Sequence, residues 1–329
     1  MKDQILSMLS SAEDFLSGQA ISRELGISRA AVWKAIQKFR QEGYVIESGT
    51  NRGYRLQRAS MPLTAERITA LLPRQHPWRE QIVCFDSVGS TNTLAKSMAS
   101  SGAPHGTVLI ADHQTDGRGR LGRSFLSPAG TGVYLSVILR PQCVPGALMH
   151  LTCAAAAAMC SAVQRVTGIR PGIKWTNDLV CQGRKLAGIL TELSIEAESG
   201  MVQYAVVGIG INCRQKLSDF PPEIRDLAGS LSMISGKETD RSRIAAAMIT
   251  ALEEMDRLLM TQKAEIMDVY RKDCITVGKE VTLHRGAEVR SGKALDVDEN
   301  GALIVQLADG QTEAVNSGEV SVRGLYGYV

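Results

Sequence analysis

The chain has 329 residues, of which 44% are hydrophobic and 22% are charged, and its formal net charge is +3. This length predicts two or three domains, and the hydrophobic content excludes an intrinsically disordered chain. The seven cysteines include no C-x-x-C pair, which excludes a metal centre built on such a pair and predicts reduced thiols in a cytoplasmic protein.

The excess positive charge lies near the N-terminus. Residues 1–60 hold nine Lys/Arg and six Asp/Glu, whereas the rest of the chain holds 28 of each. Such an asymmetry predicts a polyanionic partner for this segment.

The N-terminus lacks the apolar core of a signal peptide, and the longest apolar stretch, residues 147–166, contains His150, Gln164 and Arg165. We therefore predict a buried core helix there and no membrane role.

Two helices joined by a tight turn are predicted within residues 1–62. Residues 20–25 and 29–40 have helical spacing, Gly26 suits the left-handed residue that ends the first helix, and Ser28 can cap the second. The buried stripe is expected to consist of Val32, Ile36 and Phe39. Together with a basic outer face, these are the parts of a helix-turn-helix DNA-binding domain.

A hairpin after the second helix predicts the wing of the same domain. Residues 44–48 and 53–56 alternate in polarity, and the tip between them carries Arg52, which could meet a phosphate. The predicted DNA-binding residues are Ser28, Arg29, Trp33, Lys34 and Arg52. A small helical protein-interaction domain is the alternative, but the charge, the turn and the wing all favour DNA. Which bases are read does not follow from charge.

Residues 57–81 contain three prolines around a helical stretch at 65–72, and we interpret them as a linker with one helix. From residue 82 onward, strands and helices alternate. The predicted strands are 82–85, 107–111, 133–139, 185–193 and 202–211, and the predicted helices are 91–100, 146–167 and 241–270. This mixture predicts an α+β domain on a mostly antiparallel or mixed sheet.

The most informative segment is the alternation of glycine and arginine at residues 117–123, Gly-Arg-Gly-Arg-Leu-Gly-Arg. Such a sequence suits neither a strand nor a helix interior. Its glycines allow a close approach of the backbone, and its arginines are forked donors for phosphate or carboxylate. A disordered Gly/Arg tract is the alternative, but the segment lies between two apolar strands. We predict an anion-binding loop, which is not a Walker A loop because the G-x-x-x-x-G-K-[ST] pattern is absent.

Two further segments carry polar residues at expected strand or helix ends. Lys174–Leu179 contains Asn177 and Asp178 at a predicted tight turn, and Lys185 begins the following strand. A lysine at a strand end is usually just solvated. Residues 90–92, Ser-Thr-Asn, stand at the start of a helix, where capping is the simpler explanation if they are considered alone.

These segments, in this order, resemble the biotin–protein ligases, and more closely the bifunctional kind that also represses biotin synthesis genes. The similarity covers nearly the whole chain. It rests on S-R-A-A-V-W-K-A-I from Ser28, S-T-N from Ser90, Q-T-D-G-R-G-R-L-G-R from Gln114, K-W-T-N-D-L from Lys174, R-K-L-A-G-I-L from Arg184 and G-I-G-I-N from Gly208. The glycine–arginine loop together with the R-K-L-A-G strand is the most specific part.

The resemblance implies roles for individual residues. The residues expected to bind biotin are Ser90, Thr91, Asn92, Gln114, Arg118, Gly119, Arg120 and Lys185. Those expected to bind the nucleotide are Arg118, Arg120, Lys185, Asn212 and Arg323. The catalytic set is Arg118, Arg120, Lys185 and Asp178. No metal-binding residues of the protein are predicted.

The resemblance also implies the domain order. Residues 1–62 would form the winged helix-turn-helix, 63–274 the central mixed-sheet α/β catalytic domain and 275–329 a small SH3-like β-barrel.

The sequence departs from the family pattern at Phe125, where relatives often carry tryptophan and its N–H donor. The segment 213–231, expected to cover the adenine, cannot be matched residue by residue.

The implied reaction has two steps. Biotin's carboxylate attacks the α-phosphorus of ATP, which releases pyrophosphate and leaves biotinyl-5′-AMP. A lysine of a biotin carboxyl carrier protein, or of the carrier domain of acetyl-CoA carboxylase, then attacks the mixed anhydride. Arg118, Arg120 and Lys185, with Mg²⁺ on the phosphates, would neutralise the converging charges. Asp178 is hypothesised to position or deprotonate the incoming lysine.

The resemblance further implies that the adenylate-bound chain forms a homodimer and binds operator DNA, with the strand 187–193 as the candidate dimer edge. Three alternatives remain. A non-catalytic biotin-sensing repressor is disfavoured by Lys185 beside an intact loop, and a lipoate ligase by the helix-turn-helix and the R-K-L-A-G strand. The third is a ligase that has lost operator binding.

Overall fold

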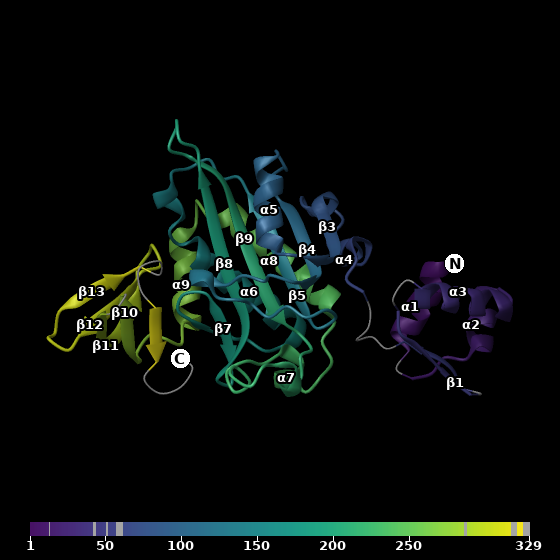
Figure 1. The fold of residues 1–329 in the computed structure, drawn as a ribbon. Coiled ribbons are helices and arrows are strands. Elements are labelled where there is room, and N and C mark those ends of the chain that lie inside the picture. The colour runs from purple at the N-terminus through teal and green to yellow at the C-terminus, as the bar shows by residue number, and fades with distance from the viewer. Residues whose placement is uncertain are drawn as a thin grey trace. The chain divides into compact units, whose positions relative to one another are not determined.

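The computed structural model describes every residue except 13, 42–43, 51, 57–61, 286–287, 317–320 and 325–329. The chain divides into two compact units, Met1–Pro62 and Leu63–Val329, which are described separately (Figure 1).

The first unit contains three helices and a two-stranded hairpin. The helices are α1 (Lys2–Ser11), α2 (Gly18–Leu25) and α3 (Arg29–Gln41), and the antiparallel strands are β1 (Ile46–Gly49) and β2 (Gly53–Leu56). Its buried residues come from all five elements, and Val32, Ile36 and Phe39 of α3 lie at the centre as predicted. The predicted helix-turn-helix is confirmed.

The turn between α2 and α3 has the geometry expected from the sequence. Gly26 ends α2 with φ 64° and ψ 31°, a left-handed conformation that costs glycine little. The Ser28 hydroxyl accepts a hydrogen bond from the Ala31 N–H at 3.1 Å and so caps α3. Both local predictions are confirmed.

The second unit is built on a seven-stranded mixed sheet. Its strands are β3 (Ile82–Val88), β4 (Thr107–Gln114), β5 (Gly132–Leu139), β6 (Gly172–Lys174), β7 (Asp178–Cys181), β8 (Arg184–Ile195) and β9 (Val202–Asn212), in the order β3-β4-β5-β9-β8-β7-β6. The β3–β4 pair is parallel and the other pairs are antiparallel. The predicted mixed sheet is confirmed.

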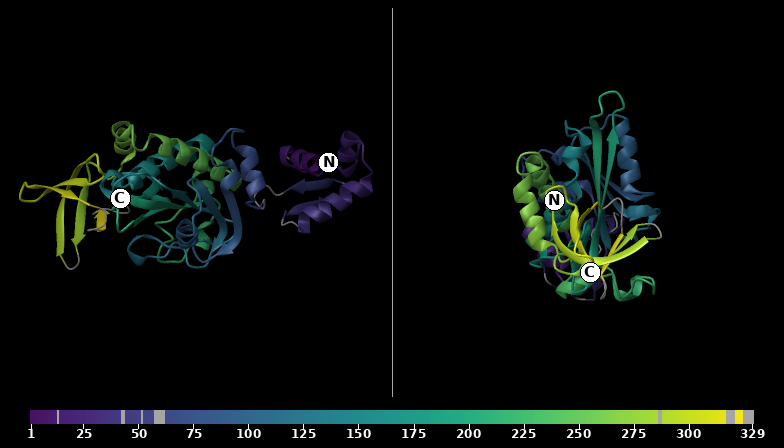
Figure 2. Two further views of the ribbon diagram at one scale, coloured as in Figure 1. Left: turned by 90° about the horizontal axis from the view of Figure 1, so that it is seen from above. Right: turned by 90° about the vertical axis from the view of Figure 1, so that its left-hand side faces the viewer.

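Helices cover both faces of this sheet. One face packs against α5 (Thr91–Ser100), and the other against α6 (Leu151–Thr167) and α8 (Arg241–Leu258), with α9 (Lys263–Asp273) beside α6. The right-hand view of Figure 2 shows α5 and the α8–α9 pair on opposite sides of the sheet. The short helix α7 (Leu231–Ser235) follows β9.

The predicted apolar helix lies inside the core. The segment Pro145–Thr167 is the one stretch among the described residues that is long and apolar enough to cross a membrane. Its most apolar 18-residue window has a mean hydropathy of 1.6, and 67% of that window is buried in the protein. Its five successive alanines let α8 pack closely against α6. Burial of this kind is typical of a core helix.

The interpretation of residues 57–81 as a linker is wrong from Leu63 onward. The predicted helix exists as α4 (Ala65–Leu71), but Leu63, Ile68 and Leu72 are buried in the main core of the second unit, and α4 packs on α8. The prolines suggested a linker because they interrupt regular structure, whereas long-range packing determines where these side chains lie.

The chain ends in a five-stranded antiparallel sheet. Its strands are β10 (Glu280–Arg285), β11 (Glu288–Val297), β12 (Leu303–Leu307), β13 (Thr312–Val315) and β14 (Ser321–Gly324), in the order β13-β12-β11-β10-β14. Side chains such as Val281 and Leu303 join the same core cluster as α6 and α8. Closure of this sheet into an SH3-like barrel stays a prediction.

Candidate active site

A cavity of about 540 Å³ opens where β4, β8 and β9 meet the loop that follows β4. Its lining joins the three segments that the sequence singled out. The polar lining residues are Ser90, Thr91, Asn92, Gln114, Arg118, Arg120, Arg123, Ser124, Lys174, Asn177, Asp178 and Lys185. The remaining lining residues are glycines, apolar side chains and Trp175.

The glycine–arginine segment is an ordered loop. It leaves β4 after Gln114 and returns to β5 at Gly132. Inside it, the Phe125 N–H donates to the Gly117 carbonyl at 2.8 Å, and the Gly119 N–H donates to the Arg123 carbonyl at 2.6 Å. These bonds fold the segment back on itself beside the cavity, as the prediction of a specific loop requires.

The arginines of this loop have different surroundings. The Arg120 guanidinium donates to Asn177 Oδ1 at 3.0 Å, and both residues line the cavity. Burial lowers the pKa of Arg120 below its usual value. Arg118 is half-exposed and forms a 3.4 Å ion pair with Asp116 at the surface. Arg120 is thus already held in the cavity, whereas Arg118 faces water.

Lys185 is not an ordinary solvated strand-end lysine. Its Nζ lies 2.6 Å from Asp178 Oδ1, and both side chains line the cavity. A register shift in the β7–β8 ladder between Leu179 and Val180 accompanies this pairing. The Lys185 backbone is also fixed, because its N–H donates to the Leu227 carbonyl at 2.7 Å.

The Ser-Thr-Asn segment is more than a helix cap. Ser90 is the N-cap of α5, yet its side chain makes no capping bond, unlike Ser230 and Asp240 in the same unit. Thr91 binds Gln114 twice: its N–H and its hydroxyl both reach Gln114 Oε1, at 2.8 and 3.0 Å. The capping explanation therefore fails for Ser90, and Thr91 orients Gln114.

Both the nitrogen and the oxygen of the Asn92 side-chain amide have protein partners. Its amide nitrogen donates to the Leu190 carbonyl at 3.2 Å and to Glu192 at 2.9 Å, and its carbonyl oxygen lies 2.7 Å from the Ser136 hydroxyl. Because both amide hydrogens have protein partners, Asn92 can offer a ligand little beyond its oxygen. It anchors α5 to β8.

Glycines on β8 and β9 make room for these side chains. A Cβ on Gly208 would lie 1.8 Å from Asn92 Oδ1, and one on Gly210 would lie 2.3 Å from the Phe125 ring. The Phe125 ring thus lies close to the β9 backbone at Gly210 and forms an apolar part of the cavity wall.

Among the predicted residues whose side chains are described, Asn212 does not line the cavity, and several lining residues were missed. Asn212 is buried, and its amide donates to the Gly229 carbonyl and accepts from Gln215, both at 3.0 Å. Arg323 has a described backbone in β14, but its side chain lies outside the described residues. Lys174, Asn177 and Arg123 belong to the lining; they stand within the quoted motifs, so the motifs could have identified them.

The predicted DNA-binding residues of the first unit fall into two groups. Ser28, Arg29, Trp33 and Lys34 are exposed on one part of α3, with Trp33 57% exposed. Arg52 is also exposed, but it pairs with Asp14 at 3.1 Å and stacks on Phe15. A phosphate would have to compete with Asp14 for Arg52.

The cysteine thiols are poorly suited to nucleophilic chemistry. All seven cysteines are free, and burial raises the pKa of the Cys153 thiol to about 11, which disfavours a nucleophilic thiolate. Within the described residues, no group of three His, Cys, Asp or Glu side chains could hold a metal ion.

Comparisons with known proteins agree on both units. Residues 84–212 match the model of the biotin/lipoate A/B protein ligase family, residues 2–55 match that of an HTH domain, and residues 276–323 match that of the biotin protein ligase C terminal domain. The chain is 36% identical to the bifunctional ligase/repressor BirA of Bacillus subtilis over 310 residues, which covers 94% of each chain.

Two further similar proteins are also biotin–protein ligases. The chain is 35% identical over 251 residues to the biotin–[acetyl-CoA-carboxylase] ligase of Mycobacterium tuberculosis, covering 74% of this chain and 89% of the relative. The solved structure of biotin protein ligase from Aquifex aeolicus in complex with biotin and ATP matches with a TM-score of 0.64 and 31% identity, over 74% of this chain and 99% of that chain.

The contact between Gly208 and Asn92 generates a stability prediction. Gly208→Ala should cost about 1–3 kcal/mol, because the new Cβ would overlap Asn92 Oδ1 in a closely packed site. Thermal unfolding should show a lower Tm, and Gly208→Ala combined with Asn92→Gly should recover part of the loss. Gly146→Ala is the control, because open space surrounds Gly146. An unchanged Tm for Gly208→Ala would contradict the described packing.

Proposed function

This chain belongs to the biotin/lipoate A/B protein ligase family, and from that membership we infer that it is a biotin–protein ligase that also represses transcription. It activates biotin with ATP to biotinyl-5′-AMP and transfers the biotinyl group to a lysine of a carrier protein. The observation that carries the inference is 36% identity to a bifunctional ligase/repressor over 94% of both chains.

The charge of the cavity supports the first step. Biotin's carboxylate oxygen forms a bond to the α-phosphorus of ATP, and the bond to the pyrophosphate leaving group breaks. The step brings two anions together. Among the described lining residues, five are cationic and one is acidic; the cations are Arg118, Arg120, Arg123, Lys174 and Lys185. We assign Arg118, Arg120 and Lys185 to the carboxylate and the α-phosphate, where fixed positive charge stabilises the transition state.

The apolar and amide groups of the lining support a biotin subsite in the same cavity. Gln114 uses its oxygen for Thr91 and one amide hydrogen for Ser127, at 2.9 Å, so its orientation is set before a ligand arrives. We assign biotin contacts to Ser90, Thr91 and Gln114, with Gly119 allowing close approach of the loop. Asn92 would act by holding α5 rather than through its amide hydrogens.

We propose that Mg²⁺ enters with the nucleotide. The oxygens of Asn177 and Asp178 are donors of the type that Mg²⁺ accepts, and this ion usually takes most of its ligands from phosphates and water. Bound there, it would neutralise phosphate charge.

The second step requires a neutral lysine amine on the carrier, and AMP leaves as the new amide forms. We assign Asp178 to positioning or deprotonating that lysine. Because Asp178 also pairs with Lys185 at 2.6 Å, it holds Lys185 in place during the first step. The carrier would be the biotin carboxyl carrier domain of acetyl-CoA carboxylase, the enzyme named for the mycobacterial relative.

The first unit supplies repression. Its helix-turn-helix binds operator DNA, and we propose that Ser28, Arg29, Trp33 and Lys34 meet the DNA through α3 while Arg52 meets phosphate at the wing. The protein would act in the cytoplasm, where ATP, the carrier and the operator occur together, and where its seven cysteines remain free thiols.

We further propose that the adenylate-bound chain dimerises through β8. Within the described chain, β7 pairs with β8 only as far as Gly188, so the open edge begins later than the predicted 187–193. That edge exposes Leu193 and Ile195, at 41% and 53%. Asn92 binds both Leu190 and Glu192, which gives the cavity a direct link to the edge.

Biotin-dependent exchange of labelled pyrophosphate into ATP tests the enzyme directly. Lys185→Met should lower the exchange rate by about 100-fold or more, because it removes a cation from the charge-developing centre. Lys237→Met, at an exposed site, is the matched control. Absence of exchange in the wild type would contradict ligase activity, whereas equal exchange in Lys185→Met would contradict only the site assignment.

Arg120→Gly should release the adenylate. The change removes the bond from Arg120 to Asn177 that ties the loop across the cavity, so water and foreign amines gain access. Labelling of non-cognate lysines should rise about tenfold or more while the thermal unfolding profile is retained. Arg74→Gly, outside the cavity, serves as the control. Labelling at the wild-type level would refute this role for the loop.

Ligand-dependent dimerisation can be measured by sedimentation velocity. Addition of biotin and ATP should roughly double the mass, because two open β8 edges can pair as antiparallel strands. Leu193→Asp should keep the chain monomeric by placing a charge at that edge. A mass that stays constant with both substrates present would refute the proposed dimer.

A further inference from the structure

The anion-binding loop starts from a fork in the sheet. Strands β4 and β5 are paired as far as Ala111 and Tyr134, and beyond that pair they separate. β4 continues along β3 to Gln114, while β5 continues along β9 from Gly132. Residues 115–131, including the glycine–arginine segment, bridge the two arms, so the geometry of the fork sets how the loop leaves the sheet.

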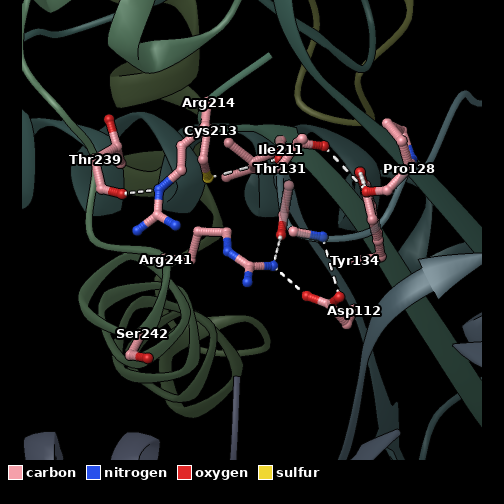
Figure 3. A network of polar contacts seen from close by, with 12 residues as sticks. Asp112, Pro128, Thr131, Tyr134, Ile211, Cys213, Arg214, Thr239, Arg241 and Ser242 are labelled. Carbon is pink, nitrogen blue, oxygen red and sulfur yellow. Dashed lines mark hydrogen bonds and ion pairs between the residues drawn. The ribbon is translucent and has the colours of Figure 1, made fainter. Parts of the chain in front are cut away.

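Asp112 lies at the opening of this fork and binds the returning arm. Its Oδ2 accepts a hydrogen bond from the Gly130 N–H at 3.0 Å, and its Oδ1 forms an ion pair with Arg241 (Figure 3). A carboxylate on β4 thus holds the end of the loop just before β5 begins.

Arg241, at the start of α8, contacts both β4 and β5. It is the first residue of α8, its side chain is only 3% exposed, and besides Asp112 its Nη1 reaches the Gly132 carbonyl at 3.2 Å. One guanidinium therefore contacts β4 and the first residue of β5 at once. A charge buried this deeply is costly unless it is paired, so Asp112 and Arg241 require each other.

The same anchor reaches the segment after β9. The Thr131 carbonyl accepts from the N–H groups of Cys213 and Arg214, at 3.1 and 2.8 Å, and Arg214 Nε donates to the Thr239 carbonyl at 2.6 Å (Figure 3). Thr239 lies two residues before Arg241. The bases of two cavity-forming segments, the anion-binding loop and the segment that carries Leu227, thus share one buried polar network.

Tyr134 extends the network to the cavity wall. Its hydroxyl donates to the Pro128 carbonyl at 3.0 Å, and its ring packs edge-on against Phe125 with 6.4 Å between the centroids. Phe125 lines the cavity. Contacts therefore run from Arg241 through the stem of the loop, meaning its residues next to β4 and β5, to Phe125, which would touch the ligand. Neither Asp112 nor Arg241 lines the cavity.

We propose that Asp112 and Arg241 are positioning residues that hold the stem of the loop 115–131 closed, and thereby set how long the acyl-adenylate is retained. The proposal rests on the ligase activity inferred above. Chemistry at the α-phosphorus uses the cations of the cavity, which the pair does not touch. Release of the adenylate requires the loop to swing away from its stem, and a pinned stem makes that opening less frequent.

The test separates formation of the adenylate from its loss. Radiolabelled biotin and ATP are mixed with the full-length chain, and adenylate release is followed by filter binding after a chase with unlabelled biotin. Asp112→Asn combined with Arg241→Met removes both charges, so neither is left buried alone. This double variant should release the adenylate about tenfold faster than the wild type, while biotin-dependent pyrophosphate exchange at saturating substrates changes less than twofold.

Conservative and matched variants complete the design. Asp112→Glu keeps a carboxylate for Arg241 and should release the adenylate no more than about threefold faster than the wild type. Asp273→Asn removes a comparable pair, Arg170–Asp273 at 2.6 Å, far along the chain from the loop. It should lower the Tm without changing adenylate release. Each Tm is measured in parallel, so that an effect of general stability is recognised.

Two outcomes would overturn the proposal. A double variant that retains the adenylate as long as the wild type does would show that the pair only stabilises the fold. Faster release in Asp273→Asn to the same extent would show that any loss of stability opens the loop. If the wild type forms no adenylate, the ligase function itself fails, which is a separate result.

Discussion

The second unit depends on holding several positive charges beside one cavity. Like charges at this spacing repel one another, and burial adds a desolvation cost. In the structure, three of these cationic side chains have the following contacts. Lys185 is paired with Asp178, Arg120 is bonded to the neutral amide of Asn177, and Arg118 remains half-exposed beside Asp116. An arriving carboxylate or phosphate would compete with Asp178 for Lys185 and with the neutral Asn177 amide for Arg120.

Close packing between layers makes this arrangement possible. Gly208 and Gly210 let the Asn92 amide and the Phe125 ring lie directly on β9, which brings α5 and the loop toward Lys185 on the neighbouring strand. A site assembled in this way is sensitive to single methyl groups. The polar network at Asp112 and Arg241 then fixes the stem from which the loop reaches the cavity.

Much of the fold could be predicted because its signals are local. The helix-turn-helix, the mixed sheet and the position of the glycine–arginine loop follow from spacing, glycine and charge within short windows. The linker interpretation failed at Ile68, because only packing against a helix far along the chain shows that this side chain is buried. Asn212 stays a predicted nucleotide contact; the sequence did not indicate that its amide bonds to Gly229 and Gln215.

The sequence alone determined which residues could bind anions and DNA, since residue type fixes charge, donor number and the backbone conformations that glycine permits. Only the tertiary structure decided which partners they take. Ser90 leaves its helix uncapped, Arg52 is held by Asp14, and Asp112 finds Arg241 across 129 positions of chain. Local preferences act over a few residues, whereas the choice of an ion-pair partner depends on how distant strands and helices pack together.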